Sequence, residues 1–167
     1  MSKRFWLSVL YVLTIGFLSN FAALFVDRKK LSESKFPFRL YGWEKNGRLY
    51  DRIAIRRWKN RAPDMSRIFR KLMPKQVRAD TTAADIVSLI KETCVSELVH
   101  LCLLILSLAV LFICPGWEGL LLYSLCLLGN VPFIIIQRYN RPQYQAAFER
   151  LTRREERKRL AYSDSVV

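Results

Sequence analysis

The only histidine of the chain, His100, stands three residues after Glu97, where a charged stretch gives way to an apolar run. Two ionisable groups are costly at such a position in a membrane helix, so their presence predicts a functional site. At positions i and i+3 they share one face of a helix, where the carboxylate can hold and polarise the imidazole. The pair therefore predicts a general base, His100, oriented by Glu97.

Further polar residues follow the same face of this predicted helix. At about 100° per residue, the stripe consists of Thr93, Ser96, Glu97, His100 and Ser107, with Glu92 at its edge. A polar stripe on an otherwise apolar membrane helix faces protein or a wet cavity rather than lipid. The competing explanation is that these side chains only form hydrogen bonds with neighbouring helices, as polar groups in membranes often do.

A second polar group lies where the last apolar segment ends. Asn130 and Pro132 stand near that end, and the run Gln137-Arg138-Tyr139-Asn140-Arg141-Pro142 follows. Pro132 removes a backbone hydrogen bond and is expected to kink the helix beside the Asn130 amide. An ordinary stop-transfer sequence needs only lysine or arginine, so the run 137–142 predicts a site. We expect His100 to face Asn130 and this run across a short hairpin.

Three apolar segments must position these residues. Phe5–Val26 has 22 residues without a charge, while Leu98–Cys114 and Gly119–Ile136 have 17 and 18 residues. About 20 apolar residues are needed to cross a bilayer. The intervening Pro-Gly-Trp-Glu at 115–118 is typical of a turn with an interfacial aromatic. The sequence therefore predicts an α-helical integral membrane protein with about three transmembrane helices, the last two forming a hairpin.

The second of these segments is expected to begin before its apolar run. Thr82 followed by Asp85 resembles a capping box, and Ala83–Cys114 contains no glycine or proline. We therefore expect one long helix that starts at the interface and enters the membrane. The predicted organisation is an N-terminal transmembrane anchor (1–26), a basic, aromatic interface region (27–80), the long helix with the hairpin (81–136) and a basic C-terminal tail (137–167).

The first segment has an alternative interpretation as a secretory signal. Lys3 and Arg4 precede an apolar core, as in a signal peptide. However, 22 apolar residues are long for such a core, and no clear cleavage site follows. We favour an uncleaved anchor.

Lysine and arginine counts predict the orientation. Residues 27–95 carry 18 of the 28 basic residues, and the tail from Gln137 carries 8. A hairpin returns the chain to its own side, so these two regions share one face, which the positive-inside rule makes cytoplasmic. Lys3 and Arg4 oppose this orientation mildly. We expect a multi-pass protein of the cell membrane with its middle region and C-terminus in the cytoplasm.

Aromatic and basic residues alternate through the interface region, as at Trp43, Tyr50 and Trp58-Lys59. Such a pattern suits the lipid headgroup layer, with rings half immersed and cations reaching phosphate. Asn46-Gly47 fits a turn that closes a short hairpin between Trp43 and Tyr50, and Leu49–Trp58 fits either a strand or a helix. In the simplest interpretation this region only anchors the protein.

Composition argues against several classes of protein. The net charge is +14, and the basic residues flank apolar spans and alternate with aromatic residues. This pattern favours anionic lipid over nucleic acid as a partner. Cys94, Cys102, Cys114 and Cys126 lie in or beside the apolar helices, where thiols act as small apolar groups. With one histidine and no Cys-x-x-Cys, no metal site is predicted. Glu97-x-x-His100 is half of a di-iron motif, but its second half is absent from the sequence.

The polar runs closely resemble those of the glycosyl-4,4'-diaponeurosporenoate acyltransferase family, which makes the last step of staphyloxanthin-type carotenoid synthesis. The resemblance is carried by Asn130-Val131-Pro132, by the run 137–142, by Glu92-Thr93 with Glu97 and His100, and by Tyr50, Arg57-Trp58-Lys59 and Asp64. It spans roughly Trp43 to Arg159, with the C-terminal run its most specific part. One departure is Gln143, where a basic residue is expected.

The resemblance implies transfer of a fatty acyl group to a sugar hydroxyl of a membrane-bound glycosylated carotenoid. His100 can then act as general base, with Glu97 fixing its tautomer and with Glu92 and Tyr139 in support. Side-chain amides of Asn130, Gln137 or Asn140 would stabilise the oxyanion or bind the acceptor. Arg138, Arg141, Trp58 and Lys59 would bind a phosphate of the donor or a lipid headgroup. Without a GxSxG motif, direct transfer is favoured over an acyl-enzyme.

The remaining choices stay open at the level of sequence. The partners expected are membrane lipids, a lipophilic glycosylated acceptor and a fatty acyl donor such as acyl coenzyme A, which acts as a co-substrate, so no cofactor is required. Related glycolipids are alternative acceptors, because fold resemblance does not fix a substrate. The rival function is a noncatalytic membrane adaptor that binds anionic lipid or a partner enzyme. The oligomeric state cannot be read from the sequence.

Overall fold

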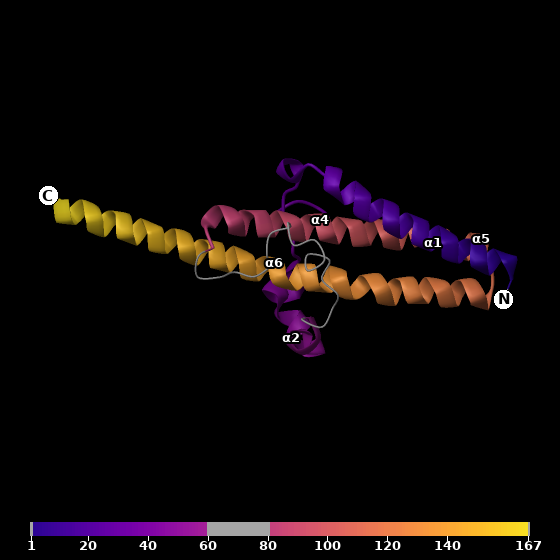
Figure 1. Cartoon of the computed structure of the whole chain (residues 1–167). Helices are drawn as coiled ribbons and strands as arrows, with labels where there is room; N and C mark the ends of the chain where they lie inside the picture. Colours follow the sequence, from indigo (N-terminus) through magenta and orange to yellow (C-terminus); the bar gives the residue numbers. More distant parts are fainter. Residues whose placement is uncertain (1, 60–80, 167) are drawn as a thin grey trace.

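Long helices dominate the protein. The computed structural model describes residues 2–59 and 81–166, which form helices and their connections without strands (Figure 1). The long helices are α1 (Lys3–Ala22), α4 (Ala83–Ser107) and α6 (Trp117–Val166). By length and composition, α1, α4 with the residues that follow it, and α6 can each cross a membrane. The predicted α-helical membrane fold with three spans is confirmed.

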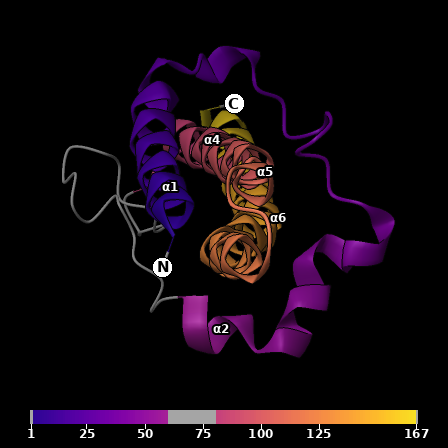
Figure 2. The ribbon, with the colours of Figure 1, turned by 90° about the vertical axis from the view of Figure 1, so that its right-hand side faces the viewer.

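Between α1 and α4 the chain runs round the helices, and we call its described part, residues 26–59, the collar. Figure 2 looks along the helices and shows the collar passing round α4 and α6. It contains the short helices η2 (Arg28–Lys30), η3 (Gly42–Ile53) and α2 (Ile55–Trp58), and η1 (Ala23–Phe25) precedes it. Of the two conformations open for residues 49–58, the structure shows helix.

The collar turns sharply at the predicted position. Lys45, Asn46 and Gly47 have positive φ inside η3, so two short helical pieces meet there at a kink. Gly47 then lies against α6, where a Cβ would be 3.2 Å from Pro142 Cγ. Its φ of 85° and this close approach both favour glycine, which lets η3 pack directly on α6.

The start of α4 is the predicted capping box. Thr82 Oγ1 accepts from the Asp85 N–H over 3.2 Å, and an Asp85 carboxylate oxygen accepts from the Thr82 N–H over 2.9 Å. The prediction of one helix to Cys114 needs a correction. α4 ends at Ser107, its last turn tightens into i to i+3 hydrogen bonds, and α5 (Val110–Ile113) completes the span.

A tight turn joins α5 to α6, as predicted. Gly116 has a φ of 103°, which few other residues adopt. Gly119 lies under the end of α5, where a Cβ would be 1.8 Å from the Cys114 carbonyl oxygen. Only glycine allows α6 to begin so close to α5.

α6 is much longer than predicted. It runs for 50 residues and continues through Pro132 and Pro142, so its length is about 75 Å at about 1.5 Å per residue. Residues 137–166 are therefore not a separate tail but the continuation of a membrane helix, and the kink expected at Pro132 does not end it. Freed backbone groups at prolines are tolerated in membrane helices when neighbours satisfy them.

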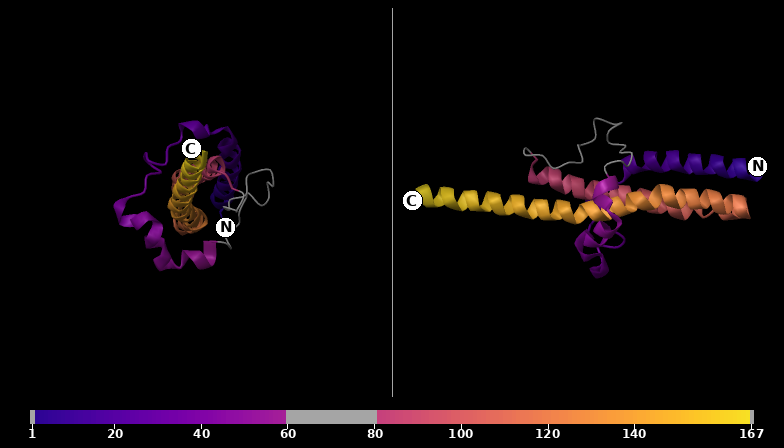
Figure 3. Two further views of the ribbon diagram at one scale, coloured as in Figure 1. Left: turned by 90° about the vertical axis from the view of Figure 1, so that its left-hand side faces the viewer. Right: turned by 90° about the horizontal axis from the view of Figure 1, so that it is seen from below.

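The chain ends lie at opposite ends of the molecule (Figures 1 and 3). Ser2 Oγ donates to Glu118 over 2.7 Å, so the N-terminus meets the hairpin turn. α1 then runs along α4, and the Tyr11 hydroxyl donates to the Leu106 carbonyl over 3.0 Å. The collar surrounds α4 and α6 near the middle of the molecule, and the C-terminal half of α6 extends from there away from the hairpin turn (Figure 1). The basic residues of the collar and of this half of α6 therefore lie on the same side of the apolar helices.

Candidate active site

Glu97 is buried between two arginines of α6. Its side chain is 1% exposed, and Arg138 Nη1 donates to one carboxylate oxygen over 2.6 Å. Arg141 Nη2 donates to the other oxygen. Charge-assisted hydrogen bonds of this kind are about twice as strong as neutral ones. Glu97 therefore joins α4 to α6.

Glu44, from the collar, is the second buried carboxylate. Its side chain is fully buried, and Arg138 donates to it through Nε and Nη2, each over 2.7 Å. The Tyr41 N–H and the Tyr50 hydroxyl also donate to this carboxylate. Two arginines thus face two glutamates, and the charges of this buried network (Glu44, Glu97, Arg138 and Arg141) cancel. Such pairing offsets the cost of taking four charges out of water.

The arginines also hold the collar by its backbone. Arg138 donates to the carbonyl oxygens of Pro37 and Arg39 over 3.1 and 3.0 Å. Arg141 donates to the Phe38 carbonyl and, over 2.9 Å, to Thr93 Oγ1 on α4. The buried network is therefore the joint at which the collar, α4 and α6 meet.

These contacts differ from the predicted roles of three residues. We expected Glu97 to hold His100, and Arg138 and Arg141 to bind a phosphate. Instead Glu97 neutralises both arginines, and Arg138 also pairs with Glu44. The physical reason is burial, since Arg141 is fully buried and Arg138 is 9% exposed. A buried guanidinium is destabilising unless a carboxylate is paired with it, so both arginines are neutralised inside the protein and do not bind a phosphate from outside.

His100 instead pairs with Asn130 across the hairpin, which confirms that the two face each other. His100 Nδ1 lies 2.8 Å from Asn130 Oδ1, and Asn130 Nδ2 donates to the Cys126 carbonyl over 2.8 Å. The bond to Cys126 fixes the amide orientation, so Oδ1 is the acceptor and Nδ1 carries the proton. In the neutral ring Nε2 then carries the lone pair.

The imidazole ring has a defined place in the membrane region. It stacks on Phe133 with ring centroids 4.7 Å apart and 9° between the planes, and it is half-buried. His100 lies one helical turn from Glu97, about 4.5 Å closer to the hairpin turn. The buried network thus forms the outer boundary of the apolar region, and His100 lies just inside it.

A third polar cluster lies where the collar meets α6, with Tyr139 buried, Lys59 and Asn140 half-buried and Arg56 exposed. Lys59 Nζ donates to Asn140 Oδ1 over 3.0 Å and lies 4.7 Å from the centre of the Tyr139 ring. Arg56 Nε donates to the Tyr139 hydroxyl over 3.0 Å and pairs with Asp51. Burial, and then the nearby Arg56 charge, lower the pKa of Lys59 below its ordinary value. We call Arg56, Lys59, Tyr139 and Asn140 the surface cluster.

The remaining predicted residues are dispersed. The Trp58 indole donates to the Ile53 carbonyl over 3.0 Å. It packs against an apolar cluster shared by the collar and α6, formed by Tyr50, Ile55, Ile136 and Tyr139. Glu92 pairs with Arg28 over 2.9 Å, and Gln137 is buried. Asn140 lies ten residues from Asn130, about 15 Å along α6. Of the three amides that were alternatives for the oxyanion or the acceptor, Asn130 is the one that lies beside His100. Asp64 lies outside the described residues.

Gln143, the departure from the family pattern, bonds within α6. Its amide donates to the Tyr139 carbonyl over 3.2 Å, and its side chain is exposed. A lysine or arginine at this position would extend from the same helix toward the surface cluster.

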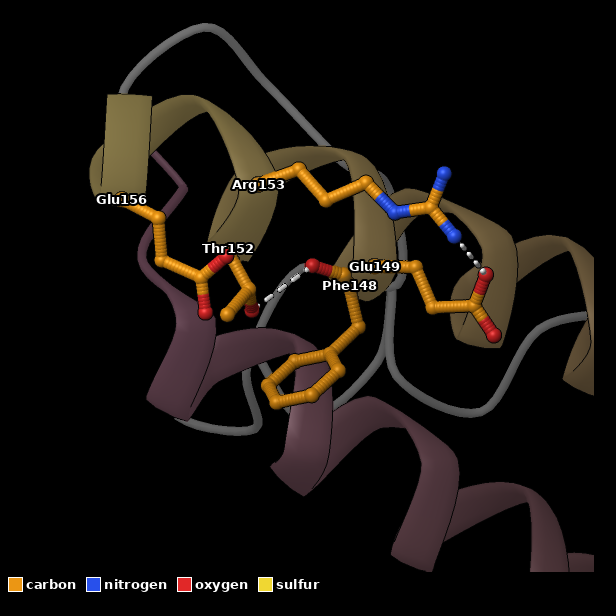
Figure 4. A pocket seen from close by; sticks show the side chains of 5 residues that line it. All are labelled: Phe148, Glu149, Thr152, Arg153 and Glu156. Atoms are coloured by element: carbon orange, nitrogen blue, oxygen red, sulfur yellow. Dashed lines mark hydrogen bonds and ion pairs between the residues drawn. The ribbon is translucent and has the colours of Figure 1, made fainter. Parts of the chain in front are cut away.

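A surface pocket lies farther along α6. It is lined by Phe148, Glu149, Thr152, Arg153 and Glu156 (Figure 4). Phe148 points toward α4, while Arg153 lies on the other side of α6 and pairs with Glu149 over 3.9 Å. Phe148 is 18 residues from Asn130, about 27 Å along the helix. This pocket is therefore separate from His100.

Glu44 is the central residue that the sequence did not reveal. It lies in a basic, aromatic stretch with no motif around it, and its partner Arg138 is 94 residues away. Burial itself raises the pKa of Glu44, but the bonds from Arg138, Tyr41 and Tyr50 outweigh burial, and the pKa is lowered. Only the docking of the collar on α6 brings this carboxylate and its arginine together.

The lowered pKa predicts a pH-dependent contribution of Glu44 to stability. Because its folded pKa lies below the usual 4.5, the contribution is present above that value and is lost as pH falls through the folded pKa. We expect Glu44→Gln to lower the free energy of unfolding by about 1–3 kcal/mol at neutral pH. The deficit relative to wild type should shrink as the pH falls below 4.5. Thermal unfolding in detergent across this range measures it, and a deficit independent of pH would contradict the charge-based origin.

Comparison with known proteins now identifies the family. The sequence model of glycosyl-4,4'-diaponeurosporenoate acyltransferase matches residues 33–150, more than two thirds of the chain. The chain belongs to this family. The matched range contains the whole buried network, the His100–Asn130 pair and the surface cluster, and membership makes the protein an acyltransferase.

Two curated relatives carry the same family name. The glycosyl-4,4'-diaponeurosporenoate acyltransferase of Staphylococcus haemolyticus (strain JCSC1435) is 28% identical over 123 residues, which cover 72% of this chain and 70% of the relative. That of Staphylococcus aureus (strain bovine RF122 / ET3-1) is 27% identical over 133 residues, covering 79% and 80%. No solved structure matches this acyltransferase.

Proposed function

We propose that this acyltransferase moves a fatty acyl group to a sugar hydroxyl of a membrane-bound glycosylated carotenoid or a related glycolipid, with His100 as general base. The single observation that supports it best is the His100–Asn130 pair, 2.8 Å apart and just inside the buried network. The family name supplies the reaction class and the kind of acceptor. The pair supplies a residue that can perform proton transfer.

Proton transfer follows from the tautomer of His100. A sugar hydroxyl is a weak nucleophile, so its proton must leave as its oxygen attacks the acyl carbonyl. With Nδ1–H bonded to Asn130, Nε2 is the ring atom that accepts the proton. The imidazolium then returns the proton to the leaving group. Asn130 keeps the ring in this orientation and is a positioning residue for the base.

The oxyanion of the tetrahedral intermediate needs a donor close to the same base. Asn130 Nδ2 uses one N–H on the Cys126 carbonyl, and its second N–H is oriented by the same bond. A preorganised amide donor beside a developing oxyanion lowers the barrier substantially. Glu97 has no direct part in this scheme, because its carboxylate holds Arg138 and Arg141. It positions α4 relative to α6.

Donor binding is best assigned to the surface cluster. Arg138 and Arg141 are neutralised by glutamates, whereas the hydrogen-bond and ring partners of Lys59 among the described residues are a neutral amide and a phenol ring. An ammonium has three N–H donors. Lys59 can therefore donate to a phosphate while it keeps its hydrogen bond to Asn140. Trp58 supports the backbone next to Lys59 through its bond to Ile53. An activated acyl donor with a phosphate fits this arrangement.

The collar and the C-terminal end of α6 face the cytoplasm in this scheme. Both carry basic residues and lie on the same side of the apolar helices, away from the hairpin turn, and the positive-inside rule places such regions in the cytoplasm. A cysteine introduced at Ser163 should therefore react with a membrane-impermeant thiol reagent only after the cells are opened. Labelling of this cysteine in intact cells would show that the C-terminal end of α6 lies outside the cell.

The function is tested directly by the lipids that the protein produces. Cells that contain a glycosylated carotenoid or glycolipid acceptor are compared with and without the protein by mass spectrometry of their membrane lipids. We expect an acceptor species whose mass increases by one fatty acyl group only in cells that express the protein. Identical lipid profiles in cells known to contain a suitable acceptor would contradict the proposal.

Asn130→Ala should slow acyl transfer while the protein stays folded. Loss of the hydrogen bond to Nδ1 removes about 1–2 kcal/mol, which corresponds to about a 5- to 30-fold lower kcat. Asn130→Asp, which still accepts from Nδ1–H, should retain more activity. Steady-state kinetics in detergent measure both, and Ser124→Ala is the matched control because Ser124 also bonds to the carbonyl four residues before it on α6. Equal activity of Asn130→Ala and the control would remove Asn130 from the mechanism.

A further inference from the structure

Beyond the collar, α6 carries a basic stripe on one face. At about 100° per residue, Arg150, Arg153, Arg154 and Arg157 lie within about 50° of a common direction. All four are exposed, and Arg153 forms a long ion pair with Glu149 at 3.9 Å. We call these four arginines the α6 stripe.

The α6 stripe continues the face on which the collar packs. Arg157 is 18 residues from Tyr139, which is five full helical turns and the same direction. Tyr139 contacts Lys59 and Arg56, so the surface cluster and the stripe share one side of α6. Further exposed cations of the collar lie beside the cluster, and these are Arg48, Arg52 and Arg57. The surface cluster and the α6 stripe thus place cations along one side of α6.

The α6 stripe lies on the side of α6 that faces away from α4. Phe148 points toward α4, and Arg153 projects from the other side of α6 (Figure 4). Among the described residues 2–59 and 81–166, the stripe is therefore not a seam between helices. Its four arginines are exposed.

The distance from the membrane indicates the kind of partner. Arg150 and Arg157 lie 12 and 19 residues beyond Arg138, about 18 and 28 Å farther along α6. Electrostatic attraction is screened over about 8 Å at physiological ionic strength. Lipid headgroups at the level of the buried network are therefore too far from the α6 stripe for electrostatic attraction to its arginines. A soluble acidic partner can reach it.

We propose that the α6 stripe docks an acidic carrier protein that presents the fatty acyl group as a thioester on a phosphopantetheine arm. This inference rests on the proposed acyl transfer and names its donor. The carrier protein would lie on the stripe, and the phosphate of its arm would lie at Lys59 and Asn140. The thioester would then reach His100 and Asn130, about 15 Å farther along α6.

The reaction is balanced with this donor. The sugar oxygen forms a bond to the acyl carbon, and the bond from that carbon to the carrier sulfur breaks. The hydroxyl proton passes to His100 Nε2 and then to the leaving thiolate. The products are an acylated sugar and a carrier protein with a free thiol. On α6 the cluster and the stripe span residues 139–157, about 27 Å, which suits a protein better than a small thioester.

The test compares two donors on the full-length protein in nanodiscs. One donor is an acidic acyl carrier protein charged with palmitate, and the other is palmitoyl coenzyme A. We expect Arg150→Glu/Arg154→Glu/Arg157→Glu to lower kcat/KM about tenfold or more with the carrier protein and to leave transfer from palmitoyl coenzyme A unchanged. Added salt should weaken the reaction with the carrier protein more than the reaction with palmitoyl coenzyme A, whose only charge contact in this scheme is the phosphate at Lys59.

A matched pair of single variants isolates position from charge. Arg154 lies on the stripe, whereas Arg159 is exposed on the opposite face of α6. Arg154→Glu should weaken carrier binding, and Arg159→Glu should not. Equal effects of the two variants would overturn the docking surface, as would binding that depends on anionic lipid in the nanodisc rather than on the stripe.

Binding measurements separate this inference from the proposed function. His100→Ala should bind the palmitoylated carrier protein as tightly as wild type but transfer no acyl group. If wild type binds the carrier and neither donor yields an acylated glycolipid, docking stands and the proposed function fails. If palmitoyl coenzyme A is used but the carrier protein does not bind, docking fails and the function stands.

Discussion

His100→Ala is expected to abolish acyl transfer, with a rate lower by about 10²- to 10⁴-fold, because the sugar hydroxyl loses its proton acceptor. The amount of protein in the membrane should not change, since His100 is only half-buried and lies outside the buried network. His100→Gln should be equally inactive, because an amide can bond to Asn130 but cannot accept a proton at neutral pH. Mass spectrometry of membrane lipids and kinetics in detergent measure the loss.

A neighbouring residue on α4 gives the control. Cys102 is exposed on the apolar part of the helix, so Cys102→Ala changes the same helix without touching the histidine pair. It should retain wild-type activity. Full activity of His100→Gln at equal protein level would remove the general base and favour a noncatalytic adaptor.

Glu97→Ala is expected to lower the free energy of unfolding by about 3–5 kcal/mol, because it leaves two buried arginines with one carboxylate. Arg141 loses its only carboxylate partner among the described residues, and Arg138 retains Glu44. Activity should fall as well, since α4 and α6 lose the joint that aligns His100 with Asn130. Thermal unfolding of the detergent-solubilised protein measures the stability.

Two further variants separate charge pairing from lost packing. Glu149→Gln breaks an ion pair with Arg153 whose side chains are 66% and 74% exposed, so it should change stability little. Glu97→Met combined with Arg141→Met removes a carboxylate and an arginine together and should cost less than Glu97→Ala alone. If the double variant is the less stable one, the arginine has a role beyond neutralising Glu97.

Much of the fold was accessible from local patterns. The apolar run at 5–26, the capping box at Thr82 and the glycine-containing turn at 115–118 each depend on residues close in sequence. The length of α6 was missed because Pro132 and Pro142 normally end helices in water. Within a membrane protein the surrounding contacts tolerate them, and the helix continues.

The site was only partly predictable for a related reason. His100 was recognised because an ionisable residue in an apolar helix is unusual, and its facing residue followed from the hairpin. Its partner was assigned to Glu97 because that residue is three positions away, but Glu97 satisfies arginines 41 and 44 positions away. Competition for a buried carboxylate depends on every cation that the fold brings near it. A sequence shows which cations could pair with the carboxylate, but only the fold determines which of them lies beside it.

The distance in sequence between Glu44 and Arg138 has a consequence for biogenesis. The collar leaves the ribosome 94 residues before its arginine, and at about 5–20 residues per second it waits several seconds for a partner. During that interval Glu44 must remain hydrated, so the collar stays outside the bilayer while α1 is already inserted. Assembly therefore finishes only when the last helix is threaded, and chains truncated before α6 should be left with an undocked collar that cellular proteases can recognise.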